Sequence, residues 1–415
     1  MPQFRIQSPL TCVKVIFMTA CIAATAHATL VFQTGAGVRS FALANNYTAM
    51  PSGVSGLYFN PAALGFLSSS QASFSVDWIN NLVNTAYFGT ADSAGRQSVR
   101  ILNAGLAMKV PTSVGGLGFG AAYQSPLSFA DQLTYQGQYL QGGSLVQESK
   151  DYHAAGSLDF WSVGGGVQVA EGLSLGGSIS LVTGREDVLV QYSRFTNGII
   201  LDSVNDDYSA SIERDYLGFD FRVGVLYEPT KLFRIGLMIA VPAVERFSET
   251  DDESFPLLDS TDSFTSNGQL ESSFSGALGV AVPLQFLTLA VDARFRAPYN
   301  GQPDNSDASR WRMGAGLGVE VPIRVIGLVA RAGYSYDQFD PYEFLFKYDY
   351  SAADVVPYTA VQDRQLISGG LEYSPTRRVS FEAAYGYSFW KLSTDAVLLE
   401  MHHLHRVVVG MTIRY

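Results

Sequence analysis

Histidines near the C-terminus are the first residues whose types suggest chemistry. His402, His403 and His405 stand close together, and alternation along a strand would bring two of them to one face, as a metal site requires. No cysteine stands near them, and Glu400 is the only acid close by. We therefore favour a solvated loop over a metal site here, and we expect no metal.

An acidic run, Glu249-Thr250-Asp251-Asp252-Glu253, offers oxygen ligands of the kind that Ca²⁺ prefers. Its spacing is not that of an EF-hand loop. We therefore interpret this run as a solvated rim of the protein.

The sequence gives little support for a catalytic function. A hydrolase needs a nucleophile with a histidine placed beside it. His153 is the only histidine between residue 28 and the terminal trio, and no strand-to-helix nucleophile elbow supports it. Gly164-Gly165-Gly166 lacks the following Lys-Ser/Thr of a phosphate loop. We expect neither catalytic residues nor a cofactor.

Four arginines could bind a ligand. Residue parity brings Arg294, Arg296, Arg310 and Arg312 to one face of two consecutive predicted strands, which the loop at 298–309 joins. Guanidinium groups bind carboxylates through two parallel hydrogen bonds, which would suit a fatty-acid head group. Alternatively, these arginines pair with acids such as Asp292 and Glu320 and satisfy a polar interior. We favour this second interpretation.

The elements that carry these residues are predicted to be membrane-spanning strands. Apolar residues alternate with Gly, Ser and charged residues of both signs in stretches of about ten residues. In the last such stretch Val407, Val409, Met411, Ile413 and Tyr415 share one face, and Arg406 and Arg414 lie on the other. The same pattern recurs at 217–227, 287–296 and 310–321. One face of each strand suits lipid and the other a hydrated interior, although a secreted β-sandwich would also alternate.

Two kinds of connection separate these strands. Six tight turns are predicted at 110–114, 170–172, 228–231, 283–284, 322–324 and 374–377, and longer polar loops at 125–156, 249–271, 298–309 and 338–362. Short turns at one end and long loops at the other are typical of outer-membrane barrels. Twelve strands flank the six turns, and one strand at 72–90 and one at 406–415 complete a count of fourteen.

Tryptophans test this layout. Trp161, Trp311 and Trp390 are predicted at the loop ends of strands, where an aromatic belt would lie, whereas Trp78 does not fit. The fold class is therefore predicted as all-β, an antiparallel transmembrane barrel of fourteen strands over residues 71–415.

Composition and the first residues indicate export. With 47% hydrophobic residues, 16% charged residues and a net charge of -11, the chain is neither disordered nor suited to binding nucleic acid. Residues 1–28 hold Arg5 and Lys14, an apolar run and Ala26-His27-Ala28, the pattern of a cleaved signal peptide. Cleavage would remove both cysteines, so disulfides are not expected to stabilise the exported protein.

Residues 29–70 do not follow the strand pattern. They include a glycine-rich stretch around Gly35-Ala36-Gly37-Val38-Arg39-Ser40, and Asn60-Pro61-Ala62, which favours a turn. So short a segment cannot form a separate domain, and a fourteen-stranded interior is too wide for side chains alone to fill. We therefore predict that the segment packs inside the barrel.

On these residues the chain resembles the FadL family of outer-membrane transporters for long-chain fatty acids and other hydrophobic compounds. The resemblance rests on the signal peptide, on the segment that ends in Asn60-Pro61-Ala62-Ala63-Leu64, on the strand count and on a final strand that ends at Tyr415. It implies that residues 29–70 are a hatch that plugs the barrel, with Asn60, Pro61 and Ala62 as its motif. Pro51-Ser52-Gly53-Val54-Ser55 stands where the family usually has an acidic pair.

The function that this resemblance implies is passive uptake of fatty acids or other hydrophobic compounds, such as aromatic hydrocarbons, by a monomer in the outer membrane. Ligands would enter at the loop end and leave sideways into the membrane once the hatch shifts. A related group, the PorV-like barrels of protein secretion and surface attachment, shares the pattern of Gly37-Val38-Arg39-Ser40 and remains the alternative.

Overall fold

The structure is a computed structural model that describes residues 32–33, 35–113, 115–202, 206–297, 311–323, 325, 327–338, 344–348, 358–394 and 397–415. The predicted signal peptide, residues 1–28, lies outside the described residues. Among the residues that are described, no helix is long and apolar enough to cross a bilayer.

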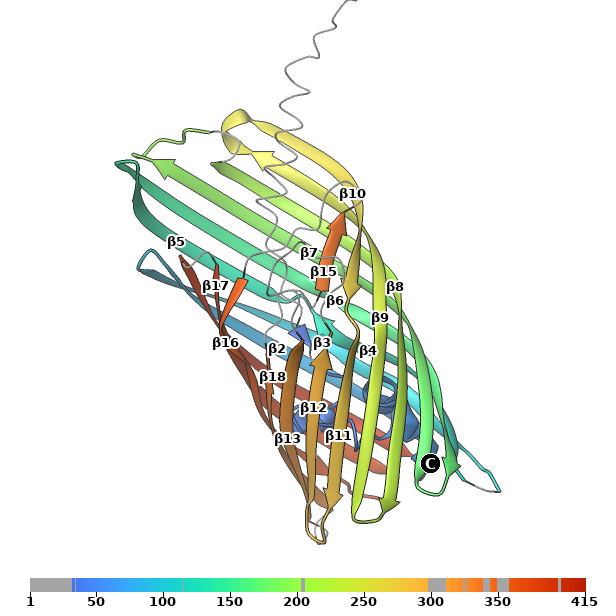
Figure 1. Cartoon of the computed structure of the whole chain (residues 1–415). Helices are drawn as coiled ribbons and strands as arrows, with labels where there is room; N and C mark the ends of the chain where they lie inside the picture. The colour runs from blue at the N-terminus through green and yellow to red at the C-terminus, as the bar shows by residue number, and fades with distance from the viewer. Residues whose placement is uncertain are drawn as a thin grey trace, which may run out of the picture.

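Antiparallel strands close into a fourteen-stranded barrel (Figure 1), as predicted. Pairing of the last strand with β2, from Leu398 opposite Tyr87 to Arg414 opposite Gln71, completes the closure. The wall strands are β2 Gln71–Tyr87, β3 Thr90–Val110, β4 Leu117–Ser128, β5 Asp131–Gln141, β6 Ser144–Ala170, β7 Leu173–Thr196, β8 Asp207–Thr230, β9 Phe233–Phe255, β10 Ser260–Ser272, β11 Ser275–Pro283, β12 Thr288–Arg296, β13 Arg312–Ile323, β14 Leu328–Asp337, β16 Tyr358–Tyr373, β17 Val379–Thr394 and β18 Leu398–Arg414.

Two of the fourteen wall positions are each shared by two consecutive strands. β4 and β5 both pair with β6, and β10 and β11 both pair with β9. Two short strands complete the sheet: β1, Phe32–Gln33, pairs with β4, and β15, Phe344–Tyr348, pairs with β10.

The six predicted tight turns are all confirmed. They connect β3 to β4, β6 to β7, β8 to β9, β11 to β12, β13 to β14 and β16 to β17. We call this end of the barrel the turn end and the opposite end the loop end. In Figure 1 the turn end lies at the bottom.

The prediction of long loops is wrong for two segments, which form strands instead. Residues 125–156 hold the end of β4, all of β5 and the first half of β6, and residues 249–271 form a hairpin of β9 and β10 around η3, Pro256–Leu258. These stretches resemble loops in sequence because they lack an outward apolar row. The predicted loop at 298–309 lies outside the described residues, as does much of 338–362.

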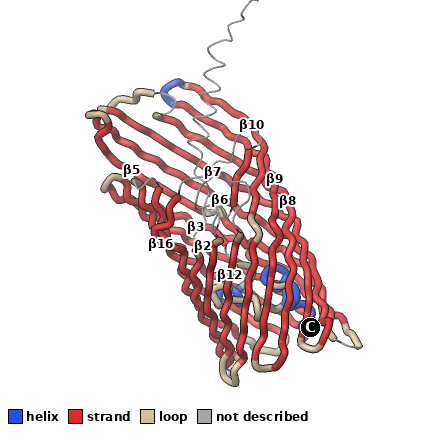
Figure 2. The backbone as a smooth tube through the Cα atoms, viewed as in Figure 1, coloured by secondary structure: helices blue, strands red, loops and turns tan. Residues whose placement is uncertain are grey.

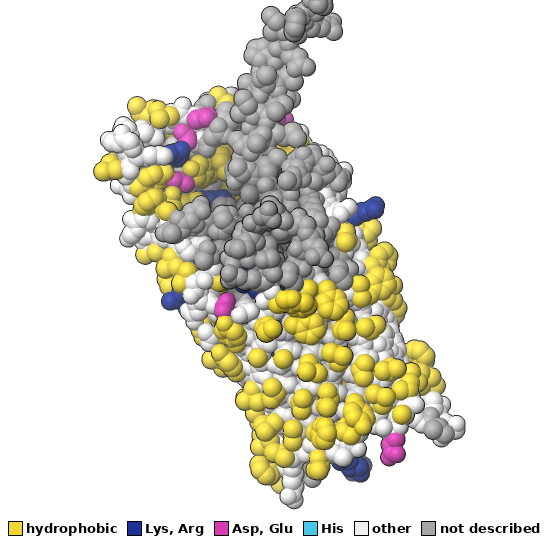
Figure 3. Space-filling model, viewed as in Figure 1, with side chains coloured by type: hydrophobic (Ala, Val, Ile, Leu, Met, Phe, Trp, Pro, Cys, Tyr) yellow, Lys and Arg dark blue, Asp and Glu magenta, His cyan; other side chains and the backbone are white. Residues whose placement is uncertain are grey.

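The alternation of faces is confirmed. Phe219, Val291 and Leu317 are 52%, 52% and 47% exposed on the outer surface, whereas Asp220 and Asp292 are buried. Figure 3 shows hydrophobic side chains gathered over the lower part of the wall. On β8 this apolar band consists of Leu217, Phe219, Phe221, Val223, Val225 and Tyr227.

Above the band the outer face becomes polar. On β8 the outward residues beyond Leu217 are Asp215, Glu213 and Ser211, and on β9 Arg246 follows Val244. The strands therefore continue beyond the apolar band toward the loop end, and their upper parts have polar side chains outside.

Trp161 and Trp311 lie on the outer surface, as an aromatic belt requires, although Trp161 lies in the middle of β6 and not at the loop end of that strand. Both are 53% exposed, but Trp390 is 2% exposed and stacks on His402 inside the barrel. The prediction was wrong for Trp390 because its position along the chain was considered without the parity of β17.

The wall is interrupted beside β3. β3 pairs with β4 only from Asn103 to Val110, and a bulge between Gln124 and Leu127 precedes the break between β4 and β5. β5 then contacts β2 from the interior: Asn81 Nδ2 donates to Asp131 Oδ1 at 2.8 Å, and Thr85 Oγ1 donates to the Thr134 carbonyl at 2.7 Å. The upper part of β3 therefore has β2 as its only paired neighbour among the described residues.

We expect Phe219→Arg to lower the free energy of unfolding in lipid vesicles by about 2–4 kcal/mol, because it puts a charge on the lipid-facing side of the apolar band. Urea titration of the refolded barrel measures this change. The control Ser211→Arg lies on the same face of β8 above the band. An equal effect of both variants would contradict the assignment of the band.

Candidate functional site

The N-terminal segment, defined here as residues 35–67, lies inside the barrel near the turn end (Figure 2). Its short helices are α2 Val38–Ala42, η1 Gly53–Ser55, α3 Gly56–Phe59 and η2 Pro61–Phe66. α2 contacts β14, β16, β17 and β18, while η1 and η2 contact β2, β3, β4, β6, β7 and β8. The segment therefore touches opposite sides of the wall.

Glycines of the wall make room for this segment. A Cβ added at Gly224 would lie 2.0 Å from Asn60 Oδ1, and one at Gly176 would lie 2.4 Å from the Ala62 nitrogen. Gly166, Gly176 and Gly224 are cross-strand neighbours on β6, β7 and β8. The same close approach occurs round the wall at Gly118, Gly236, Gly279, Gly316, Gly333, Gly370, Gly386 and Gly410. We call this set, with the three preceding glycines, the glycine seat.

Asn60, Pro61 and Ala62 lie against the glycine seat. Asn60 is fully buried and caps η2, because its Oδ1 accepts a hydrogen bond from the Ala62 N–H at 3.2 Å. Its Nδ2 donates to the Thr48 carbonyl within the segment and to the Val225 carbonyl of β8, both at 3.0 Å. Pro61 begins η2, where a helix needs no N–H donor. This one asparagine thus joins two parts of the segment to the wall.

A second anchor holds the middle of the segment. Asp292 Oδ2 on β12 accepts hydrogen bonds from the Tyr47 N–H, the Thr48 N–H and the Thr48 hydroxyl at 2.8, 2.9 and 2.7 Å. Asp292 is 1% exposed. A buried carboxylate is stabilised by such donors, so this contact satisfies the segment and Oδ2 of Asp292, while Oδ1 has no hydrogen-bond donor among the described residues.

The third anchor is ionic. Arg39 of α2 donates from Nε and Nη2 to the two carboxylate oxygens of Glu320 on β13, at 2.8 and 3.1 Å. Glu320 also accepts from Arg331 at 2.7 Å, and Arg331 pairs with Glu372. Arg39 belongs to the Gly37-Val38-Arg39-Ser40 pattern, so the structure gives this motif a docking role.

The predicted arginine cluster is brought together only in part. Arg294, Arg296 and Arg312 lie on the inner face, and Arg296 stands opposite Arg312 across β12 and β13. Arg310 lies outside the described residues. Arg294 donates to Asp337 Oδ1 at 2.8 Å and to Asn46 Oδ1 of the segment at 3.3 Å. The interpretation that these arginines pair with interior acids therefore holds for Arg294, although its partner is Asp337 and not Asp292 or Glu320.

The histidine interpretation is corrected. His402, His403 and His405 lie within β18, not in a solvated loop. His402 is 1% exposed and bonded to Glu400 at 3.1 Å, whereas His403 and His405 bond to the hydroxyls of Tyr387 and Tyr385. Strand parity separates His402 from the other two, which is why the three do not converge.

The acidic run is also corrected, because it is not a solvated rim. Glu249, Asp251 and Glu253 point inward from β9 and are 4%, 2% and 4% exposed, while Asp252 points outward. This part of β9 lies above the apolar band. Burial, together with the neighbouring Glu253 and Glu249, raises the pKa of Asp251 to about 8.

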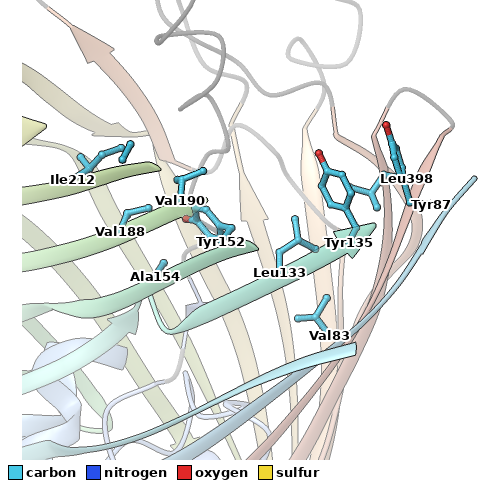
Figure 4. Close-up of a cluster of buried hydrophobic side chains, with 11 residues drawn as sticks. Val83, Tyr87, Leu133, Tyr135, Tyr152, Ala154, Val188, Val190, Ile212 and Leu398 are labelled. Atoms are coloured by element: carbon cyan, nitrogen blue, oxygen red, sulfur yellow. The ribbon is translucent and has the colours of Figure 1, made fainter. Parts of the chain in front are cut away.

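Two apolar clusters occupy the interior between the segment and the loop end. The middle cluster consists of Leu127, Phe129, Leu158, Phe160, Val182, Tyr216, Phe247 and Leu270. The upper cluster, shown in Figure 4, consists of Val83, Tyr87, Leu133, Tyr135, Tyr152, Ala154, Val188, Val190, Ala210, Ile212 and Leu398. Phe160 lies edge-on to Tyr58 of the segment, with ring centroids 6.1 Å apart. Apolar side chains therefore lead from the loop end to the N-terminal segment.

Sequence reasoning missed the glycine seat, Asp292 as an anchor and the two apolar clusters. The glycines left a signal, since they recur at inward positions toward the turn end of successive strands. The clusters left none, because their members come from strands far apart in the sequence.

Comparisons with known proteins agree with this architecture. The chain is similar to the crystal structure of the P. putida toluene transporter TodX, with 15% identity, a TM-score of 0.64, and coverage of 92% of this chain and 99% of that one. A Pseudomonas aeruginosa FadL homologue has 14% identity and a TM-score of 0.64, with coverage of 93% of this chain and 100% of that one. The Ralstonia pickettii toluene transporter TbuX has 12% identity and a TM-score of 0.60, with coverage of 92% of this chain and 99% of that one. No protein-family model matches the sequence, and no curated protein does. The likeness establishes the fold.

We expect Asn60→Ala to loosen the N-terminal segment, because Thr48 and Val225 lose a donor and η2 loses its cap. Each loss costs about 1–3 kcal/mol for a buried group left unsatisfied. Hydrogen exchange measured by mass spectrometry should show faster exchange at residues 46–62. The outward-facing Asn84 of β2 provides the control variant Asn84→Ala. Unchanged exchange in Asn60→Ala would contradict the anchoring role.

Proposed function

We propose that this chain is an outer-membrane transporter that takes up long-chain fatty acids or other hydrophobic compounds without energy coupling. The observation that carries this proposal is the succession of apolar clusters inside a closed barrel, which ends at a segment held by polar anchors. Hydrophobic compounds are favoured by such a surface, because it removes them from water. TodX and TbuX, which share the fold, are toluene transporters.

We further propose that residues 29–70 act as the hatch of this barrel. Apolar side chains of the segment, such as Phe41, Leu57 and Leu64, are buried against the wall. Three polar anchors, at Asn60, Asp292 and Arg39, add hydrogen bonds and an ion pair that fix the position of the segment. Such contacts can be exchanged for water or for one another at modest net cost. A ligand that displaced Tyr58 from Phe160 would act directly on the held segment.

The route out of the barrel is proposed to be sideways. The interruption beside β3, where β5 turns inward, leaves a wall edge with one paired neighbour among the described residues. A hydrophobic compound leaving there would enter lipid without crossing water. Export by residues 1–28, location in the outer membrane and a monomeric state belong to the same proposal.

Deletion of the gene should abolish growth on oleate or on an aromatic hydrocarbon supplied as sole carbon source at low concentration, and the full chain should restore it. Radiolabelled uptake measures the same effect in minutes. Normal uptake combined with defective surface proteins would contradict transport and favour the secretion role of PorV-like barrels.

A separate expectation concerns the arginines. We propose that Arg294 is a partner of Asp337 and Asn46 and not a head-group ligand, so Arg294→Ala should lower the free energy of unfolding by about 1–3 kcal/mol and leave oleate affinity unchanged. Titration of oleate into wild type and variant measures the affinity. A tenfold or larger loss for Arg294→Ala, with methyl oleate unaffected, would instead assign the head group to this arginine.

A further inference from the structure

The inner face of β9 above the apolar band carries a run of buried carboxylates. Glu249, Asp251 and Glu253 occupy alternate positions, so all three point inward. Glu186 of β7, with no exposed surface, completes the group through Arg214 of β8. We call these four acids the acidic wall.

Arg214 pairs with two acids of the acidic wall. Its Nε donates to Glu249 Oε2 at 2.5 Å, and its Nη1 donates to Glu186 Oε2 at 3.1 Å. Ser266 Oγ also donates to Glu249 Oε1 at 3.2 Å. Asp251 Oδ1 and Glu186 Oε1 are buried and accept no hydrogen bond from the described residues. A buried carboxylate oxygen without a donor is costly, because it has lost its hydration and gained nothing in return. Asp251 therefore presents an acceptor that a cationic donor would satisfy.

Aromatic and aliphatic side chains flank the acidic wall on both sides. Asp251 stands opposite Ile212 of the upper cluster, and Glu249 stands opposite Arg214. One pair closer to the segment, Phe247 stands opposite Tyr216, and both belong to the middle cluster. Tyr216 also donates to Glu186 Oε2 at 2.6 Å and stacks on Phe129.

The spacing of these groups matches a small amphiphile. Phe247, Glu249 and Asp251 succeed one another on one face, and each step of two residues advances about 7 Å along a strand. A ligand whose ring packed on Tyr216 and Phe247 would thus have the carboxylate of Glu249 about one such step away. The same rings attract a cation through their faces.

We propose that the acidic wall and the middle cluster together bind protonated amines with an aromatic or alkyl body, so that this barrel takes up cationic amphiphiles in addition to neutral hydrocarbons. The inference rests on the proposed transport function and names a substrate class for the same interior. The ammonium group would donate to Glu249 and Asp251, and the apolar body would lie on Tyr216, Phe247 and Phe129. Because the pKa of Asp251 is raised to about 8, this group is largely protonated near pH 7 before a ligand binds, and a bound cation would favour its ionised form. A carboxylate-bearing compound would be repelled at this position.

The test compares ligands that share one ring. Benzylamine, toluene and benzoate are titrated calorimetrically into the full chain purified in detergent, with empty micelles as the blank. We expect benzylamine to bind about tenfold or more tightly than toluene, because a charge-assisted hydrogen bond is added, and benzoate to bind more weakly than toluene. Asp251→Asn and Glu249→Gln should each reduce the benzylamine-to-toluene ratio toward one.

Controls separate the possible failures. Asp252→Asn changes the adjacent outward acid and should keep the wild-type ratio. Heat-modifiable mobility on gels shows whether each variant is folded. Equal binding of benzylamine and toluene, an unchanged ratio in folded Asp251→Asn, or methylamine binding as tightly as benzylamine would each overturn the inference. Calcium that binds and displaces benzylamine without any contribution from the ring would overturn it as well. Failure of toluene to bind, with hydrocarbon uptake also absent from cells, would instead count against the transport function.

Discussion

Closure of the wall is the constraint on which the rest of this structure depends. A strand edge inside a bilayer leaves backbone N–H and C=O groups without partners, and each such group costs several kcal/mol. Pairing of β18 with β2 removes that edge along the whole length of both strands. Once the sheet is closed, alternation along each strand separates an outer apolar band from an inner face that carries glycine, hydroxyl and charged groups together with the two apolar clusters. The difference between the inner and the outer face is therefore a consequence of the closed hydrogen-bonded sheet.

The width of a fourteen-stranded barrel creates a second requirement, since its interior must be filled or remain open. Here the N-terminal segment enters it, and the wall accommodates the segment by having no side chain where the backbones approach, as at Gly176 and Gly224. Polar groups of the segment then find partners on the wall, including Asp292 and the Val225 carbonyl. The close approach at these glycines and the hydrogen bonds to the wall act together at this contact, so a change in one would disturb the other.

Charged side chains inside the barrel are arranged in two different ways. Arg39, Glu320, Arg331 and Glu372 alternate in sign and hold the segment to β13, β14 and β16. Buried pairs of this kind fix one arrangement more than they add net stability, because desolvation offsets much of their attraction. The acids of β9 instead repeat one sign next to aromatic residues. We assign the first set to maintaining the fold and propose the second set, in which Arg214 pairs with Glu249 and Glu186, as groups for a ligand.

The sequence by itself determined the count of fourteen wall positions, the six tight turns and the alternation of faces, because these depend on local periodicity and on residues such as Pro and Gly. It also predicted that the segment containing Asn60-Pro61-Ala62 packs inside. It did not reveal the strands within 125–156 and 249–271. Tertiary structure alone decided which charges meet: Arg294 pairs with Asp337, His402 stacks on Trp390, and Glu249, Asp251 and Glu253 are buried instead of solvated. Burial and pairing depend on strands that are adjacent only after the barrel closes. The periodicity within one strand does not predict which residues will face it across the interior.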